Sequence, residues 1–283
     1  MMDATPILVL GASGYLGAHV YNALRGQSGA VVGTSFREKC PGLVQLDVRD
    51  GSETASLLDN IMPAVVLWAL QDGNHESDLI ARGLVSLLSR LPTSTRFIFM
   101  SSDAVFGAGT GPYDEDDPPS PHAPNSPVAQ YAAAKTRGEL LVRQWGGSST
   151  IVRVGPLYGP SRGGAWDRRT TAVTQSLAAG QRLGRAPNLV KSFARVDGVA
   201  RLLLHLTSDP VDGVLHVATA PRSFYEVALA IVDAGAFDPL LVHPEPVDDL
   251  SPIPLNTSLT TQRPNLMIEV RQDLDFAGLS SRV

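Results

Sequence analysis

Short apolar runs alternate with amphipathic stretches through the first half of the chain. The first run, residues 7–10, has four apolar residues in succession, as expected for a parallel strand that is covered on both faces. Apolar residues at helical spacing occupy the intervals between the runs. The runs predict strands at 7–10, 30–34, 42–46, 64–68, 96–100 and 150–154, and the intervals predict helices at 15–26, 52–60, 78–90 and 128–145. This alternation predicts an α/β fold with a doubly wound parallel sheet.

The alternation weakens beyond Gly155-Pro156. Helices are still expected at 172–179, 196–207 and 223–234, and a strand is expected at 214–218. Ser223 and Glu226 have the spacing of a helix capping box. Residues 107–127 and 158–169 are rich in glycine, proline and charged side chains. We expect the first of these stretches to be a loop over the active site and the second to face the substrate.

A glycine-punctuated turn follows the first expected strand. Gly11, Gly14 and Gly17 have the spacing Gly-x-x-Gly-x-x-Gly between that strand and the first helix. Glycines let a backbone approach a ligand closely, and the exposed amides at a helix start attract a pyrophosphate. A tight turn that binds no ligand is the alternative, because a glycine triplet alone is a weak signal. Together with the expected sheet, the turn predicts a Rossmann-type dinucleotide site.

Composition and charge exclude several classes of protein. The 283-residue chain is 43% hydrophobic and 18% charged, which suits one large domain or one and a half. A net charge of −5 provides no basic field, so nucleic acid is not an expected partner. No stretch approaches the roughly 18 apolar residues of a membrane span. Cys40 is the only cysteine, which excludes an internal disulfide and fits a reducing compartment. We therefore expect a cytoplasmic protein without a membrane partner.

Three polar side chains could carry chemistry. Tyr131 and Lys135 are four residues apart on an expected helix, so they share one face. A lysine ammonium there can lower the phenol pKa from about 10 toward the range that a general acid needs. Ser102 follows the strand expected at 96–100, at the edge of a parallel sheet where ligands bind, and can hydrogen-bond a substrate oxygen. The alternative is an exposed helix with an incidental tyrosine and lysine.

The glycine turn, Ser102 and the Tyr131/Lys135 pair, in this order, resemble the extended short-chain dehydrogenases/reductases over roughly the first 220 residues. More narrowly, the chain resembles the dTDP-4-dehydrorhamnose reductase group at Ser102-Asp103-Ala104-Val105-Phe106, at 112–121, at 42–48 and at Arg263-Pro264. The resemblance implies a catalytic triad of Ser102, Tyr131 and Lys135. It also implies that Gly11, Gly14 and Gly17 hold the pyrophosphate and that Asp47 and Val48 line the adenine. The full set of implied cofactor contacts is Gly11, Ser13, Gly14, Tyr15, Leu16, Gly17, Asp47, Val48, Ala69, Leu70, Tyr131 and Lys135. The same resemblance allows a homodimer.

The chain departs from that group beside the expected substrate pocket. Trp68-Ala69-Leu70 replaces an Asn-Ala-Ala type segment, and the stretch between Pro121 and Tyr131 is several residues longer. The exact keto substrate therefore stays open. By the same resemblance, nucleotide-sugar dehydratases of the superfamily carry an Asp-Glu pair at this place, and Ala104 occupies the position of its glutamate. Because a methyl group cannot move a proton, we expect reduction and not dehydration.

Arg37 decides the expected cofactor. The second expected strand ends without an acidic residue that would hold a ribose 2′-hydroxyl, and a guanidinium can fork onto a 2′-phosphate. NADPH is therefore expected and NADH is the second candidate, since Glu38 is adjacent and Arg37 could be a solvated surface residue. No metal is expected, because the histidines lack ligand spacing and the carboxylates at 114–117 fit a solvated acidic loop.

The sequence thus predicts an NADPH-dependent reductase that transfers a hydride to a ketone, most specifically the 4-keto group of a nucleotide-linked deoxysugar. Residues 1–160, rejoined by about 188–220, would bind the cofactor. Residues 161–187 and 221–283 would form a small interleaved substrate-binding lobe. The alternatives are an epimerase or dehydratase of the same superfamily and a non-catalytic NADP-binding regulatory subunit.

Overall fold

A seven-stranded sheet forms the centre of the computed structural model, which describes residues 6–27, 30–248 and 251–279. Every neighbouring pair of strands in this sheet is parallel. The order across the sheet is β3 (Val44–Gln45), β2 (Val31–Ser35), β1 (Ile7–Leu10), β4 (Val65–Trp68), β5 (Arg96–Met100), β6 (Ser149–Val154) and β11 (Gly213–Val217). After β1 the chain adds β2 and β3 on one side of β1, and it then returns to place β4 on the other side of β1. This reversal of strand order is where doubly wound sheets bind ligands, and the predicted fold class is confirmed.

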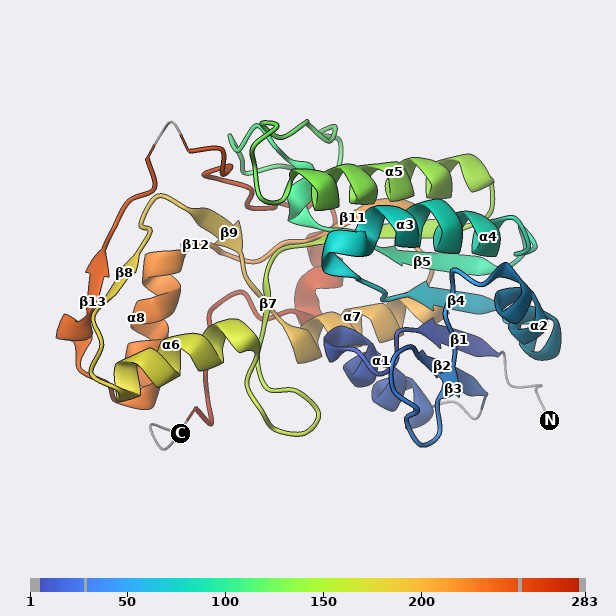
Figure 1. Ribbon diagram of the computed structural model, residues 1–283, viewed down its shortest axis with the longest axis horizontal. Helices are drawn as coiled ribbons and strands as arrows, with labels where there is room; N and C mark the ends of the chain where they lie inside the picture. The colour runs from blue at the N-terminus through green and yellow to red at the C-terminus, as the bar shows by residue number, and fades with distance from the viewer. Residues whose placement is uncertain (1–5, 28–29, 249–250, 280–283) are drawn as a thin grey trace.

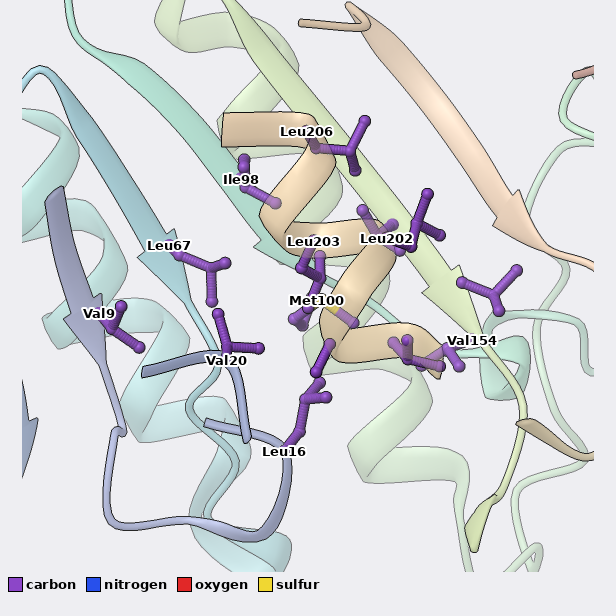
Figure 2. Close-up of a cluster of buried hydrophobic side chains, with 14 of the residues drawn as sticks. Val9, Leu16, Val20, Leu67, Ile98, Met100, Val154, Leu202, Leu203 and Leu206 are labelled. Atoms are coloured by element: carbon purple, nitrogen blue, oxygen red, sulfur yellow. The ribbon is translucent and has the colours of Figure 1, made fainter. Parts of the chain in front are cut away.

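Helices cover both faces of the sheet (Figure 1). On one face α1 (Tyr15–Arg25) and α7 (Val196–Ser208) pack on the strands. Figure 2 shows Leu202, Leu203 and Leu206 of α7 beside Ile98 and Met100 of β5. The other face carries α2 (Gly51–Ile61), the helical stretch that starts with α3 (Glu76–Asp78), and α5 (Ala129–Trp145). Burial on both faces explains why the strands are uninterrupted apolar runs.

The helix expected at 78–90 differs in two ways. It begins earlier, at Glu76, and it contains a π-helical segment, Leu79–Leu84, between α3 and α4 (Val85–Leu88). The helix expected at 172–179 also begins earlier, as α6 (Arg168–Ala178), because the Asp167 carboxylate accepts hydrogen bonds from the amides of Arg169 and Thr170. The capping box of Ser223 and Glu226 is present at α8 (Phe224–Gly235), as predicted.

A separate apolar cluster lies outside the sheet and forms a lobe, at the left of Figure 1. Helices α6 and α8 pack against each other in it, and it contains Val173, Phe193 and Ile231. The described residues also contain three pairs of short strands: β7 (Leu157–Tyr158) with β10 (Ala194–Arg195), β9 (Val190–Ser192) with β12 (Pro221–Ser223), and β8 (Leu183–Arg185) with β13 (Val242–Pro244). They contain 3-10 turns at Gly73–His75, Asp103–Val105, Pro239–Leu241 and Pro264–Glu269. The ends of the expected domain ranges, 1–5 and 280–283, lie outside the described residues.

The loop at 107–127 is held by the C-terminal segment of the chain. Backbone bridges join Thr110 to Asn256 and Tyr113 to Leu259, and the Tyr113 ring stacks on Phe106 with centroids 4.0 Å apart. The acidic stretch is part of this anchoring. The Glu115 carboxylate accepts hydrogen bonds from the amide of His216 and the hydroxyl of Thr261. This half-buried carboxylate is therefore a structural anchor, whereas the sequence led us to expect a fully solvated group.

Candidate active site

The turn between β1 and α1 has the geometry that its glycines predict. Gly11 has φ +87°, in the left-handed region that favours glycine. A Cβ atom on Gly17 would lie 2.1 Å from the carbonyl oxygen of Gly11, so this position requires glycine. Gly14 is the N-cap of α1 and has no side chain that could bond the first helix amides. The helix start can therefore receive an anion.

A cavity of about 400 Å³ opens beside this turn, at the carboxyl ends of β1, β2 and β4. Its lining includes these predicted cofactor residues: Gly11, Ser13, Gly14, Arg37, Asp47, Val48, Ala69 and Leu70. Three other predicted residues do not line this cavity. The Tyr15 hydroxyl donates to the carbonyl oxygen of Gly159, Leu16 is buried in the core, and Gly17 packs against Gly11. The cavity and the glycine turn together fit a dinucleotide.

Two arginines share one carboxylate at the outer end of the cavity. The Arg37 guanidinium, 73% exposed, lies 2.8 Å from Asp72. Arg49 lies 3.2 Å from the same carboxylate, stacks over Phe36 and donates two hydrogen bonds to Asp47. Burial raises the pKa of Asp47, but the hydrogen bonds from Arg49 outweigh this effect and hold the pKa below its ordinary value.

Lys135 lies against the wall of this cavity. Its Nζ is 3.1 Å from the carbonyl oxygen of Met100, the last residue of β5, and 3.4 Å from that of Leu70, which lines the cavity. Glu76 forms an ion pair with the same ammonium, with its Oε1 2.8 Å from Nζ. Glu76 is not among the expected site residues, because no local pattern relates a residue on α3 to one on α5.

Tyr131 and Ser102 meet beside Lys135, as the sequence predicted. The Lys135 Nζ is 5.7 Å from the centre of the Tyr131 ring, and the Ser102 hydroxyl lies close enough to the phenol to influence its pKa. Burial raises the pKa of Tyr131, the Lys135 charge lowers it and the Glu76 charge raises it, with a net upward shift. The lysine thus acts in the predicted direction. The expectation of a lowered phenol pKa is nevertheless wrong for this structure, because burial is the larger effect.

Asp103 extends this cluster toward the C-terminal segment. Its carboxylate accepts a hydrogen bond from Ser102, lies 3.0 Å from the Nζ of Lys191, and accepts a 2.5 Å hydrogen bond from Thr257. Lys191 comes from β9 and Thr257 from the C-terminal segment, so sequence spacing gave no signal for either. The resulting row of polar contacts runs from Lys191 through Asp103 and Ser102 to Tyr131.

This site and fold agree with a family model. The model described as the NAD dependent epimerase/dehydratase family matches residues 7–227. The chain belongs to this family. The predicted relationship to extended short-chain dehydrogenases/reductases is thereby confirmed.

Known relatives of this family member include proteins of different kinds. The chain is 27% identical over 276 residues to methionine adenosyltransferase 2 subunit beta of Xenopus laevis, covering 89% of this chain and 79% of that one. A hypothetical dTDP-4-dehydrorhamnose reductase from Sulfolobus tokodaii has the same fold, with a TM-score of 0.78, 21% identity and 98% of each chain covered.

Two further solved structures of the same fold contain different nicotinamide cofactors. The dTDP-4-dehydrorhamnose reductase of Bacillus anthracis holds NADP, with a TM-score of 0.74, 18% identity and 93% and 92% of the chains covered. WbmG of Bordetella bronchiseptica holds NAD, with a TM-score of 0.78, 18% identity and 97% and 91% covered. A nicotinamide cofactor is common to both.

No helix in the described part of this chain is long and apolar enough to cross a membrane.

Proposed function

We propose that this protein is an NADPH-dependent reductase that acts on a ketone, with Ser102, Tyr131 and Lys135 as its catalytic residues. The observation that carries this proposal is the meeting of the three side chains at the carboxyl end of β5, with Lys135 touching the wall of the nucleotide cavity. A reduced nicotinamide would supply the hydride. Tyr131 gives its proton to the developing alkoxide, and Ser102 holds the same oxygen by a hydrogen bond. Lys135 stabilises this arrangement with its charge.

The proposed substrate is the 4-keto group of a nucleotide-linked deoxysugar. Residues 102–106 and 112–121 support this choice through their resemblance to dTDP-4-dehydrorhamnose reductases, and a fold neighbour bears that name. The lobe of α6 and α8, taken with the rest of 161–187 and 221–283, would bind the substrate, while 1–160 and about 188–220 would bind the cofactor. The test is NADPH oxidation against nucleotide-linked and free ketosugars. Oxidation with free ketones alone would contradict the nucleotide-sugar assignment.

Arg37 should make the enzyme prefer NADPH over NADH. A 2′-phosphate can replace Asp72 as the partner of the exposed Arg37 guanidinium, whereas a 2′-hydroxyl offers no negative charge. We expect Arg37→Ala to lower kcat/KM for NADPH by about tenfold and to change that for NADH little, since one charge-assisted contact is lost. Steady-state kinetics with both cofactors measure this. Equal use of the two cofactors by the wild type would refute the preference.

The enzyme should not dehydrate a nucleotide hexose. Ala104 offers no proton, and the Asp103 carboxylate is already held by Lys191 and Thr257. Incubation with a nucleotide hexose and oxidised cofactor should therefore yield no 4-keto-6-deoxy sugar above background. The readout is the product sugar by mass spectrometry. Formation of that product at catalytic rates would favour a dehydratase. It would also favour an epimerase, which passes through the same kind of oxidised sugar.

A non-catalytic NADP-binding regulatory subunit is the second candidate. The identity with a protein named as a subunit of methionine adenosyltransferase favours it. The carboxylate and the two carbonyl oxygens that already surround the Lys135 ammonium favour it as well. The intact set of Ser102, Tyr131 and Lys135 favours the reductase. Binding of NADPH without its oxidation by any ketone of a broad panel would decide for the subunit.

A further inference from the structure

Glu76 is a buried carboxylate that faces the proposed catalytic lysine. The Glu76 side chain is 1% exposed and that of Lys135 is 2% exposed, with 2.8 Å between carboxylate oxygen and ammonium nitrogen. Two backbone carbonyl oxygens are the other neighbours of the ammonium. The ammonium donates hydrogen bonds to these two oxygens and is paired by charge with the carboxylate. Glu76 therefore helps to fix the ammonium in one place.

Stability alone does not explain this pair. A buried ion pair adds little net stability compared with well-packed apolar residues of similar size, although removing one partner alone is costly. The position of the pair gives a better reason. Lys135 is one helical turn from Tyr131 on α5. Glu76 contacts the lysine from α3, and its charge also acts on the phenol.

The other oxygen of Glu76 is hydrogen-bonded to a residue that lines the nucleotide cavity. Oε2 accepts a hydrogen bond of 2.8 Å from the amide of Asp72, the residue whose carboxylate pairs with Arg37 and Arg49. The π-helical segment follows directly, and its first residue, Leu79, lines the cavity. Segments of π-helix occur frequently at functional sites. Glu76 is thus held between the cavity wall on one side and the lysine on the other.

We propose that Glu76 is a positioning residue of the Tyr131 site: its carboxylate holds the Lys135 ammonium at the end of β5 and offsets the lysine charge beside the phenol. This inference rests on the proposed function, because it gives Tyr131 the role of the acid. The charges that act on the phenol are those of Lys135 from α5, Glu76 from α3 and Asp103 from the turn after β5. Removing the Glu76 charge alone leaves the lysine charge without its nearest opposite charge.

The test is the ionisation of Tyr131 in Glu76→Gln. Tyrosinate absorbance is followed against pH, and the signal of Tyr131 is isolated by subtracting the same titration of the matching Tyr131→Phe variant. We expect the ionisation in Glu76→Gln to move about 1–2 pH units lower than in the wild type, the usual effect of one nearby charge. An unchanged or higher ionisation would overturn the proposal.

A second background covers the case in which Glu76→Gln does not fold. In Lys135→Met the buried ammonium is gone, so adding Glu76→Gln leaves no unpaired buried charge. The Tyr131 ionisation should be lower in the double variant than in Lys135→Met alone. Equal values would contradict the proposal.

Glu139→Gln is the matched control. Glu139 is 0% exposed and pairs with Arg153 at 2.8 Å, so the substitution removes an equally buried carboxylate that does not touch Lys135. Glu139→Gln should leave the pH at which Tyr131 ionises unchanged. A shift in Glu139→Gln as large as that in Glu76→Gln would count against a specific role for Glu76. The titration needs no substrate. A shift in Glu76→Gln without turnover of any ketone would therefore refute the reductase and leave the role of Glu76 intact.

Discussion

Tyr131→Phe should lower kcat for ketone reduction by about 10²–10⁴-fold, the usual contribution of a general acid. The substitution removes the proton donor and keeps the ring, so packing beside Lys135 and Ser102 is preserved. The nucleotide cavity is lined by residues between Gly11 and Leu79 and stays intact. NADPH should therefore bind with nearly unchanged Kd. Steady-state NADPH oxidation and a fluorescence binding titration measure the two effects separately.

Tyr21→Phe is the matched control for this experiment. Tyr21 is also a largely buried tyrosine on a helix, and its hydroxyl donates a hydrogen bond to the carbonyl oxygen of Gly42. Losing that hydroxyl should affect stability slightly and kcat by no more than a few-fold. If Tyr131→Phe retained full activity, the phenol would not be the acid and the proposed mechanism would fail.

The raised pKa of Tyr131 adds a pH dependence to this prediction. A general acid works while it is protonated, so the rate persists below its pKa and falls as the pH rises through it. Burial places the pKa of Tyr131 above its ordinary value of 10.0. The kcat of the wild type should therefore show no alkaline decline from this group between about pH 7 and about pH 10. A decline near neutral pH would indicate a different acid.

The parts of the site that the sequence predicted depend on local patterns. The run from Ile7 to Leu10 and the glycines after it define a strand, a turn and a helix start within a few residues. Tyr131 and Lys135 share a helix face because of their spacing, and Ser102 follows a strand whose carboxyl end must face the ligand edge of a parallel sheet. These relations hold in any fold that contains the elements.

The missing parts depend on contacts between distant segments. Asp72 pairs with Arg37 from 35 positions away, and Thr257 bonds Asp103 from 154 positions away. Glu76 is an ordinary polar residue in the sequence and becomes buried only because α3 packs against α5. The raised pKa of the Tyr131 phenol is unpredictable for the same reason, since the burial of this side chain cannot be estimated from its spacing to Lys135.

Gly17→Ala should weaken NADPH binding strongly. A Cβ atom at this position would lie 2.1 Å from the carbonyl oxygen and 2.8 Å from the carbonyl carbon of Gly11, and backbone atoms cannot rotate away. The turn must therefore open, at a cost of about 1–3 kcal/mol typical of overpacked sites. That cost corresponds to a Kd for NADPH raised by roughly 5–150-fold, because the amides proposed to bind the pyrophosphate move with the turn.

Gly26→Ala tests whether this effect belongs to the turn or to α1 as a whole. Gly26 is the C-cap of the same helix, and a Cβ atom there would lie 3.4 Å from the nearest carbonyl oxygen, an ordinary contact. This variant should bind NADPH like the wild type. Circular dichroism and Tm for both variants separate a shifted turn from an unfolded chain. If folded Gly17→Ala bound NADPH with the Kd of the wild type, the glycine turn would not be the pyrophosphate site, and the cofactor would have to bind elsewhere in the cavity.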